Sequence, residues 1–150
     1  MVSRRQRELY AVHLRKLIAE NGWAIQGVLH TATEPPFSYT VGLTEAGLPE
    51  LIVVGVSHEV GVVILDKLAR QSLAEELEVG RQYDLANGDQ VLTFLIGQVS
   101  RANSRKYLLA AGHHYGQHRV KALQVFWPSE HGLFPHDSGW DRYEIQPVLA

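Results

Sequence analysis

Histidines and carboxylates are the side chains of this 150-residue chain that are best suited to bind a metal or to act in acid–base catalysis. His113, His114 and His118 lie in one short segment, and imidazole is a good ligand for zinc or iron. Their spacing matches no zinc-finger or metalloprotease motif, and Gly112 and Gly116 interrupt the helix that would align them. We therefore predict no metal site and no cofactor, and expect these histidines to lie exposed near a helix end.

Glu50 is the carboxylate whose position is most informative. It follows Pro49 and directly precedes the apolar run of residues 51–56. A carboxylate at the mouth of a buried strand needs a partner, either a cluster of backbone N–H groups or an arginine, because desolvating it alone is costly. The position favours a role in tying down the preceding loop over a role in acid–base catalysis.

Aromatic and proline residues gather after the last predicted strand, in Trp127-Pro128 and Phe134-Pro135-His136. Exposing them all is unfavourable, so we expect the loop to fold back onto the body. If it returns to the end of the sheet near Glu50, one pocket for a small ligand would be lined by Tyr39, Thr40, Glu50, Trp127, Phe134 and His136. If the loop is only a plug, Trp127 and Phe134 pack against each other and His136 faces solvent.

Sequence patterns predict the elements that position these residues. Apolar residues at helical spacing predict helices over 3–20 and 58–77, and Asn103 as a cap predicts a third over 103–111. Alternating or apolar runs predict strands over 23–30, 37–43, 51–56, 82–85, 90–99 and 120–127, with a hairpin turn at Asn87-Gly88. The strand face of Ser38, Thr40 and Gly42 is small enough for a helix, the commoner explanation, or a ligand to approach closely.

Because the strands follow one another in hairpins, we expect an α+β fold. It should contain an antiparallel or mixed sheet of about five to six strands with three helices packed on it. The length fits a single globular domain over residues 1–150, with a helical N-terminus over 3–20 and an extended tail over 137–150.

Composition excludes several classes of protein. The chain has no cysteine, which rules out disulfides and thiolate chemistry, and its net charge of −2 argues against nucleic-acid binding. No apolar run is long enough to span a membrane or to form a signal peptide, so we predict a cytoplasmic protein without membrane contact.

Three motifs resemble a known family. They are Tyr39-Thr40-Val41-Gly42-Leu43, Leu48-Pro49-Glu50-Leu51, and Trp127-Pro128 followed by Gly132 and Phe134-Pro135. Over residues 22–136 the chain is similar to an uncharacterised bacterial family catalogued as domain of unknown function 4262. The resemblance implies a compact bacterial, actinobacterial or phage-borne domain and no established activity. Ser129 and His136 depart from it, since an acidic residue and a tryptophan are expected there.

The leading functional hypothesis is a domain that binds a small molecule or a protein partner through the aromatic loop. The alternatives are a hydrolase that uses histidine and glutamate, with or without a metal, and a homodimeric module that pairs through an open sheet edge. Convergence of Glu50, His136 and a second titratable group in one cleft would favour the enzyme, and dispersal of these groups would contradict it.

Overall fold

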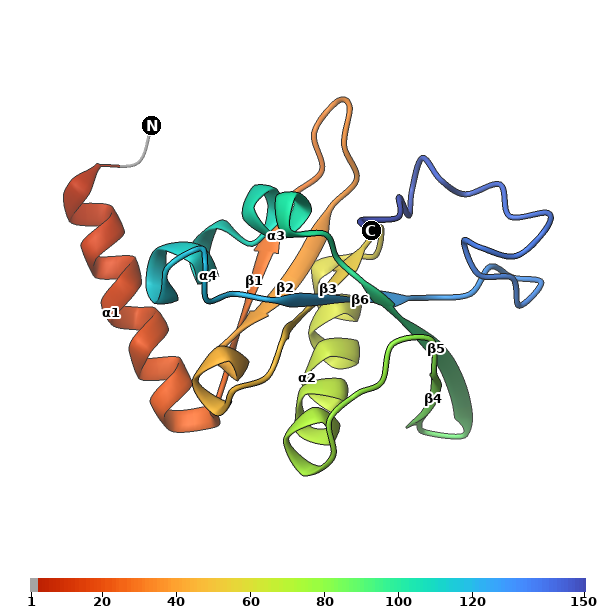
Figure 1. The fold of residues 1–150 in the computed structure, drawn as a ribbon, viewed down its shortest axis with the longest axis horizontal. Helices are drawn as coiled ribbons and strands as arrows, with labels where there is room; N and C mark the ends of the chain where they lie inside the picture. Colours follow the sequence, from red (N-terminus) through yellow and green to blue (C-terminus); the bar gives the residue numbers. More distant parts are fainter. Residues whose placement is uncertain (1–2) are drawn as a thin grey trace.

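One six-stranded mixed sheet organises the computed structural model, which describes residues 3–150 (Figure 1). The helices are α1 (Arg4–Asn21), α2 (His58–Ala74), α3 (Arg101–Tyr107) and α4 (Leu109–Tyr115), with a 3-10 turn, η1 (Leu43–Ala46). The strands are β1 (Ala24–Val28), β2 (Phe37–Val41), β3 (Glu50–Val54), β4 (Gln82–Asn87), β5 (Gln90–Gln98) and β6 (Ala122–Phe126). Their order across the sheet is β1-β2-β3-β6-β5-β4; β3 and β6 are parallel to each other, and the other neighbouring strands are antiparallel.

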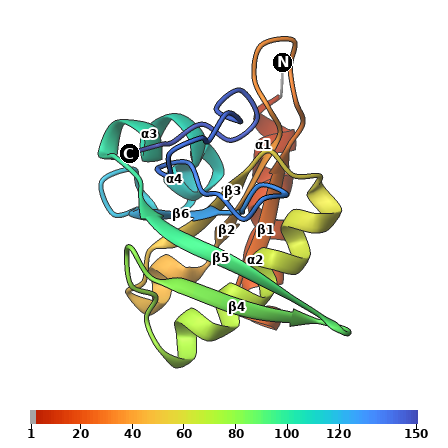
Figure 2. The same ribbon diagram turned by 90° about the vertical axis from the view of Figure 1, so that its right-hand side faces the viewer.

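Helices cover both faces of the sheet (Figure 2). On one face α2 packs Ile64, Leu65 and Leu68 against Leu51 and other inward side chains. On the other face α1, α3 and α4 cover β2 and β3. Both central strands of the parallel pair are fully buried, as the apolar sequence of residues 51–56 predicts for a strand covered on two sides.

The first helix begins and ends as its sequence predicts. The Ser3 hydroxyl accepts from the Gln6 N–H at 3.1 Å, and the Gln6 side chain accepts from the Ser3 N–H at 2.8 Å, which completes a capping box. Gly22 ends the helix with φ of 92°, a left-handed conformation that glycine adopts without strain.

The region predicted as one helix over 103–111 is two helices, so the domain has four helices over residues 3–150 rather than three. Ser100, not Asn103, caps α3, because its hydroxyl accepts from the Asn103 N–H at 3.2 Å. The Asn103 side chain instead donates to the Leu149 carbonyl at 2.9 Å. Leu108 leaves helical geometry, with φ of −91° and ψ of 56°, and separates α3 from α4.

The small-residue face of β2 meets α2, as the commoner of the two explanations predicts. A Cβ on Gly61 of α2 would lie 3.0 Å from the Ser38 hydroxyl oxygen. Gly42 is crowded from another element, since a Cβ there would lie 2.6 Å from the Gly22 carbonyl oxygen. The predicted extended tail over 137–150 contains turns at residues 143–146. The buried Gln124 side chain holds its end by donating to the Pro147 carbonyl and accepting from the Leu149 N–H.

Candidate functional site

Glu50 is enclosed by the turn that joins β2 to β3. Its side chain is 0% exposed, and burial raises the pKa of its carboxyl, an effect that hydrogen bonds oppose. The carboxylate accepts from the hydroxyls of Thr40 at 2.8 Å and Thr44 at 2.6 Å. It also accepts from the N–H groups of Gly42 at 3.2 Å, Leu43 at 3.1 Å and Thr44 at 2.8 Å. Five donors occupy the acceptor positions of this carboxylate, so it ties down the turn and has no free face for a ligand.

Thr40 and Tyr39 are also engaged within the fold. The Thr40 hydroxyl accepts from the Leu51 N–H at 2.8 Å while it donates to Glu50. The Tyr39 hydroxyl accepts from the Ala110 N–H at 2.9 Å and fastens the start of α4 to β2. Burial raises the pKa of Tyr39, and the backbone hydrogen bond from Ala110 lowers it by less.

The aromatic loop lies at the opposite end of the sheet from Glu50 (Figure 1). Glu50 pairs with Ala122 at the start of β6, whereas Trp127 follows the end of β6 and donates from Nε1 to the Val54 carbonyl at 2.7 Å. Val54 is four steps along β3 from Glu50, a span of about 13 Å. The loop therefore cannot bring Trp127 beside Glu50.

Phe134 and His136 extend from that same end. Phe134 is buried in a small cluster with Leu95 and Phe126, and His136 is 64% exposed with Nε2 at 3.7 Å from Asp137. Thr40 and Glu50 thus lie at one end of the sheet, and Trp127, Phe134 and His136 lie at the other, while Tyr39 lies in the middle of β2. Ligand contact by any one of them stays a prediction, and the convergence of Glu50 and His136 that would favour an enzyme is absent.

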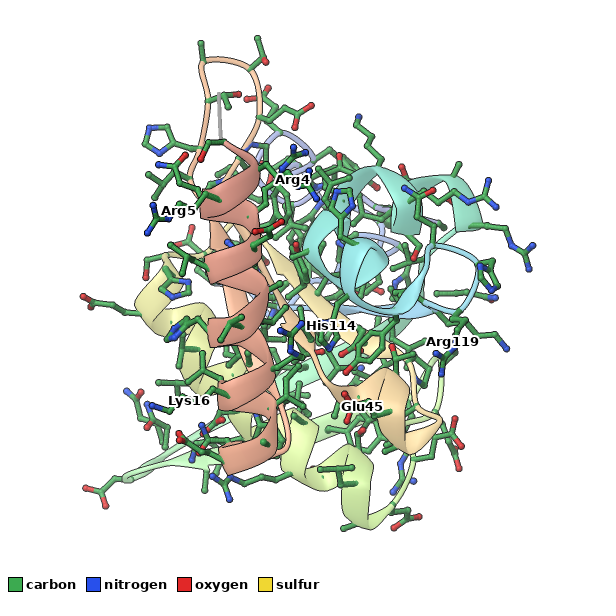
Figure 3. The ribbon with its side chains drawn as sticks, turned by 90° about the vertical axis from the view of Figure 1, so that its left-hand side faces the viewer. Arg4, Arg5, Lys16, Glu45, His114 and Arg119 are labelled. Carbon is green, nitrogen blue, oxygen red and sulfur yellow. The ribbon has the colours of Figure 1, made fainter. Side chains whose placement is uncertain are left out.

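The histidine segment ends α4. His114 is largely buried, with Nε2 at 3.8 Å from a Glu45 carboxylate oxygen, and the Tyr115 hydroxyl donates to the same oxygen at 3.0 Å. Figure 3 shows His114 and Glu45 close together beside α1. His113 and His118 do not join them, and over residues 3–150 no three side chains of histidine, aspartate or glutamate are placed to hold a metal ion.

A groove runs along β1, the strand at one edge of the sheet. It consists of two adjoining cavities of about 380 and 370 Å³ that share Ile25 as a wall. β1 and its flanking residues line the two cavities in turn, with residues 23–25 in the smaller cavity and residues 25–29 in the larger. The facing side chains of α2 recur every fourth residue, at His58, Val62, Asp66 and Arg70, which places them on one helix face. We call this feature the β1 groove.

One end of the β1 groove is formed by His58, Gly27 and Ser38. The His58 Nδ1 lies 3.3 Å from the Ser38 hydroxyl oxygen. A Cβ on Gly27 would lie 2.3 Å from the same Nδ1, so the imidazole ring occupies the space that a side chain at residue 27 would need. Gly27 and Ser38 are paired residues of β1 and β2, and the ring lies across both of them.

The other end is formed by Trp23, Asp66 and Arg70. The Trp23 indole donates to Asp66 at 3.0 Å, and the Arg70 guanidinium lies 5.3 Å from the Trp23 ring centroid. Arg70 approaches Asp66 only to 3.8 Å and its side chain is 71% exposed. Most of its N–H donors therefore face solvent at the end of the groove.

Residues 17–141 match the sequence family described as Domain of unknown function (DUF4262). The chain belongs to this family. No curated protein and no solved structure matches the chain. The DUF4262 match begins at Leu17, which lines the groove, and so includes all of β1 and α2.

The β1 groove of this DUF4262 domain has only a weak signal in the sequence. The four-residue recurrence of His58, Val62, Asp66 and Arg70 was visible, but a mixed stripe of this kind usually marks an exposed helix face. Only the pairing of β1 at the sheet edge places that stripe opposite unpaired backbone. Among residues 3–150, no helix combines the length and apolar character needed to cross a bilayer.

Proposed function

We propose that this domain binds an extended segment of a protein partner as an added strand along β1. The observation that carries the proposal is the β1 groove, whose floor is an edge strand. One wall is the recurring stripe of α2, and Leu17 and Asn21 of α1 line the end near Trp23. Extended peptides that add to a sheet edge gain affinity from backbone hydrogen bonds and specificity from pockets for alternate side chains.

The backbone of β1 supports strand addition. Within residues 3–150 β1 pairs with β2 alone, and in an antiparallel pair alternate residues turn their N–H and C=O groups away from the neighbour. The Gly27 carbonyl accepts from the Gln26 side-chain amide at 2.8 Å, which is consistent with a carbonyl directed to the free edge. Exposed edge groups of this kind are a template for another strand.

The side chains around the groove indicate what such a strand would carry. Its centre is apolar, with Ile25 on the floor and Val62 on the wall. Its two ends present nitrogen groups, the Arg70 guanidinium at one and the His58 imidazole at the other. The complementary occupant is therefore an extended segment that carries an apolar side chain between two hydrogen-bond acceptors. An acidic group is the best match at the Arg70 end.

The same geometry argues against hydrolysis at this site. Ser38 and His58 have the types of a nucleophile and its base, but Ser38 is 2% exposed and lies beneath α2. A nucleophile must reach the reacting carbon within about 3–3.5 Å, which this burial prevents. Glu50, the carboxylate considered for catalysis, is occupied by its own turn.

Selection from a library of random linear peptides displayed on phage, against immobilised full-length protein, tests the proposal. Peptides enriched on the wild type should bind Val62→Glu at least tenfold more weakly, because the carboxylate would occupy the apolar centre of the groove. Val63→Glu is the matched control, since Val63 is the next residue of α2, 45% exposed and outside the groove lining.

Fluorescence anisotropy of the labelled peptides measures both affinities. Failure to enrich any peptide, or equal affinity for Val62→Glu and Val63→Glu, would overturn the proposal. So would light scattering that shows a dimer disrupted by Val62→Glu, because a second copy would then be the occupant.

A further inference from the structure

The Ser38 hydroxyl is enclosed where β2 passes under α2. It is 2% exposed, and Gly61 of the helix lies so close that an added Cβ would be 3.0 Å from the hydroxyl oxygen. Within residues 3–150 its hydrogen-bond partner is the His58 Nδ1 at 3.3 Å. A hydroxyl always brings one proton that needs an acceptor, and a buried donor without one is costly.

This requirement decides which way the hydrogen bond runs. If the His58 Nδ1 carried a proton and donated it, the Ser38 proton would be left buried without an acceptor. If Ser38 donates to Nδ1, both groups are satisfied with a single bond. The neutral imidazole then carries its own proton on Nε2, because the hydrogen bond at one ring nitrogen sets the state of the other.

The free edge of the ring belongs to the β1 groove. His58 is exposed and lines the 380 Å³ cavity, and its Nδ1 edge faces Ser38 and Gly27. On a strand added to β1, the side chain opposite Gly27 would point to the same face of the sheet as His58. Gly27 contributes no side chain of its own, so the imidazole is the group that this incoming side chain meets.

We infer that Ser38 is a positioning residue that holds His58 as an Nε2–H donor, and that His58 selects an acceptor oxygen on one side chain of the bound strand. The selected side chain belongs to Asp, Glu, Asn, Gln, Ser or Thr. The second half of this inference rests on the proposed function, whereas the first half concerns the unbound protein alone.

Long-range ¹H–¹⁵N correlation spectra of the unbound protein test the first half. In the wild type the His58 Nδ1 should show the shift of an unprotonated acceptor and Nε2 that of a protonated donor. Ser38→Ala should return His58 to the averaged pattern of the exposed His30 and His136, with folding confirmed by circular dichroism. A protonated Nδ1 in the wild type, or identical His58 spectra in both proteins, would overturn it.

Peptide selection repeated on His58→Phe and Ser38→Ala tests the second half. The wild-type pool should be enriched in acceptor side chains at one position. His58→Phe should lose that enrichment and Ser38→Ala should weaken it, while both variants still select the apolar position. An unchanged acceptor preference in either variant contradicts this half. If peptides are enriched but show no acceptor preference, selection by His58 is refuted and the proposed function stands. If no peptide is enriched on the wild type or on either variant, both the proposed function and selection by His58 are refuted.

Discussion

At the scale of single residues, Glu50 shows that a carboxylate considered for catalysis can have all its acceptor positions filled by hydrogen bonds from the adjoining turn. Five donors from Thr40, Gly42, Leu43 and Thr44 surround it, and three of them are backbone N–H groups. The sequence predicts that a carboxylate before a buried strand needs either an N–H cluster or an arginine. Which of the two it has depends on the path of the turn, and residue types alone do not specify that path.

Replacing Glu50 with glutamine should destabilise the fold by about 2–4 kcal/mol. Either orientation of the new amide sets its NH₂ against at least one backbone N–H, because donors face both carboxylate oxygens. Urea titration measures the loss, with Glu59→Gln as a control on the exposed first turn of α2. A Glu50→Gln protein as stable as the wild type would show that the turn relaxes around the amide.

The β1 groove illustrates the limit of residue-level prediction. His58, Val62, Asp66 and Arg70 share a helix face by spacing alone, and Gly27 lies within a predicted strand. Their meeting depends on β1 being an edge strand and on α2 running beside it, from His58 near Gly27 to Asp66 near Trp23. Strand order is a long-range property that no local pattern encodes.

At the scale of elements, the aromatic loop after β6 buries Phe134, as expected for a plug, but Phe134 and Trp127 pack in different clusters. Phe134 contacts Leu95 and Phe126, whereas Trp127 packs against the main core under α2. The Trp127 backbone is held by the buried Gln146 side chain, which accepts from its N–H and donates to its carbonyl, both at 2.9 Å. Anchorage by a glutamine in the tail fixes the loop at this end of the sheet.

Truncation of Phe134 to alanine should cost about 3–5 kcal/mol, the usual loss for a buried aromatic side chain. His136→Ala, two residues away, should change stability by less than about 0.5 kcal/mol because the imidazole is 64% exposed. Thermal unfolding of the two variants under one buffer measures both. Equal losses for Phe134 and His136 would mean that the loop packs differently in solution.

Strands were predictable in place and approximate length because alternation and a glycine-containing turn are local signals. The two-residue loop is Gly88-Asp89, one residue later than the predicted Asn87-Gly88, because Asn87 pairs with Gln90. The break between α3 and α4 was not predictable from such signals. The Tyr39 hydroxyl accepts from the Ala110 N–H in the first turn of α4, and the Asn103 side chain bonds the Leu149 carbonyl instead of capping a helix. Tyr39 and Leu149 are far in sequence from these helices, and helix propensity depends only on the local sequence.

At the scale of the whole molecule, buried tyrosines make stability depend on alkaline pH. Burial raises the pKa of Tyr39 above that of an unfolded tyrosine, near 10. Above that pH the unfolded chain loses a proton that the folded chain keeps, so the free energy of unfolding falls as pH rises. The loss should approach about 1.4 kcal/mol per pH unit for Tyr39, in addition to the contributions of Tyr10 and Tyr115, whose pKa values burial also raises.

Urea titrations from about pH 9 to 11 in wild type and Tyr39→Phe isolate the contribution of Tyr39 to the pH dependence of the free energy of unfolding. The pH range is centred on the pKa of unfolded tyrosine, near 10. The variant should be less stable at neutral pH, because the Ala110 N–H loses its acceptor, yet its stability should fall less steeply with pH. Parallel curves for the two proteins would contradict a protonated Tyr39 in the folded state.

The single parallel pairing of β3 with β6 divides the molecule into two consecutive halves of chain. β1, β2 and β3 form one antiparallel half with α1 and α2, and β4, β5 and β6 form the other with α3 and α4. The connection between them passes through the turn after α2, at residues 75–81. A nick there would leave two fragments, each with an apolar strand edge that only the other can cover. Their reassociation would therefore behave as fragment complementation, in which neither piece is a stable fold by itself and each is the template for the other.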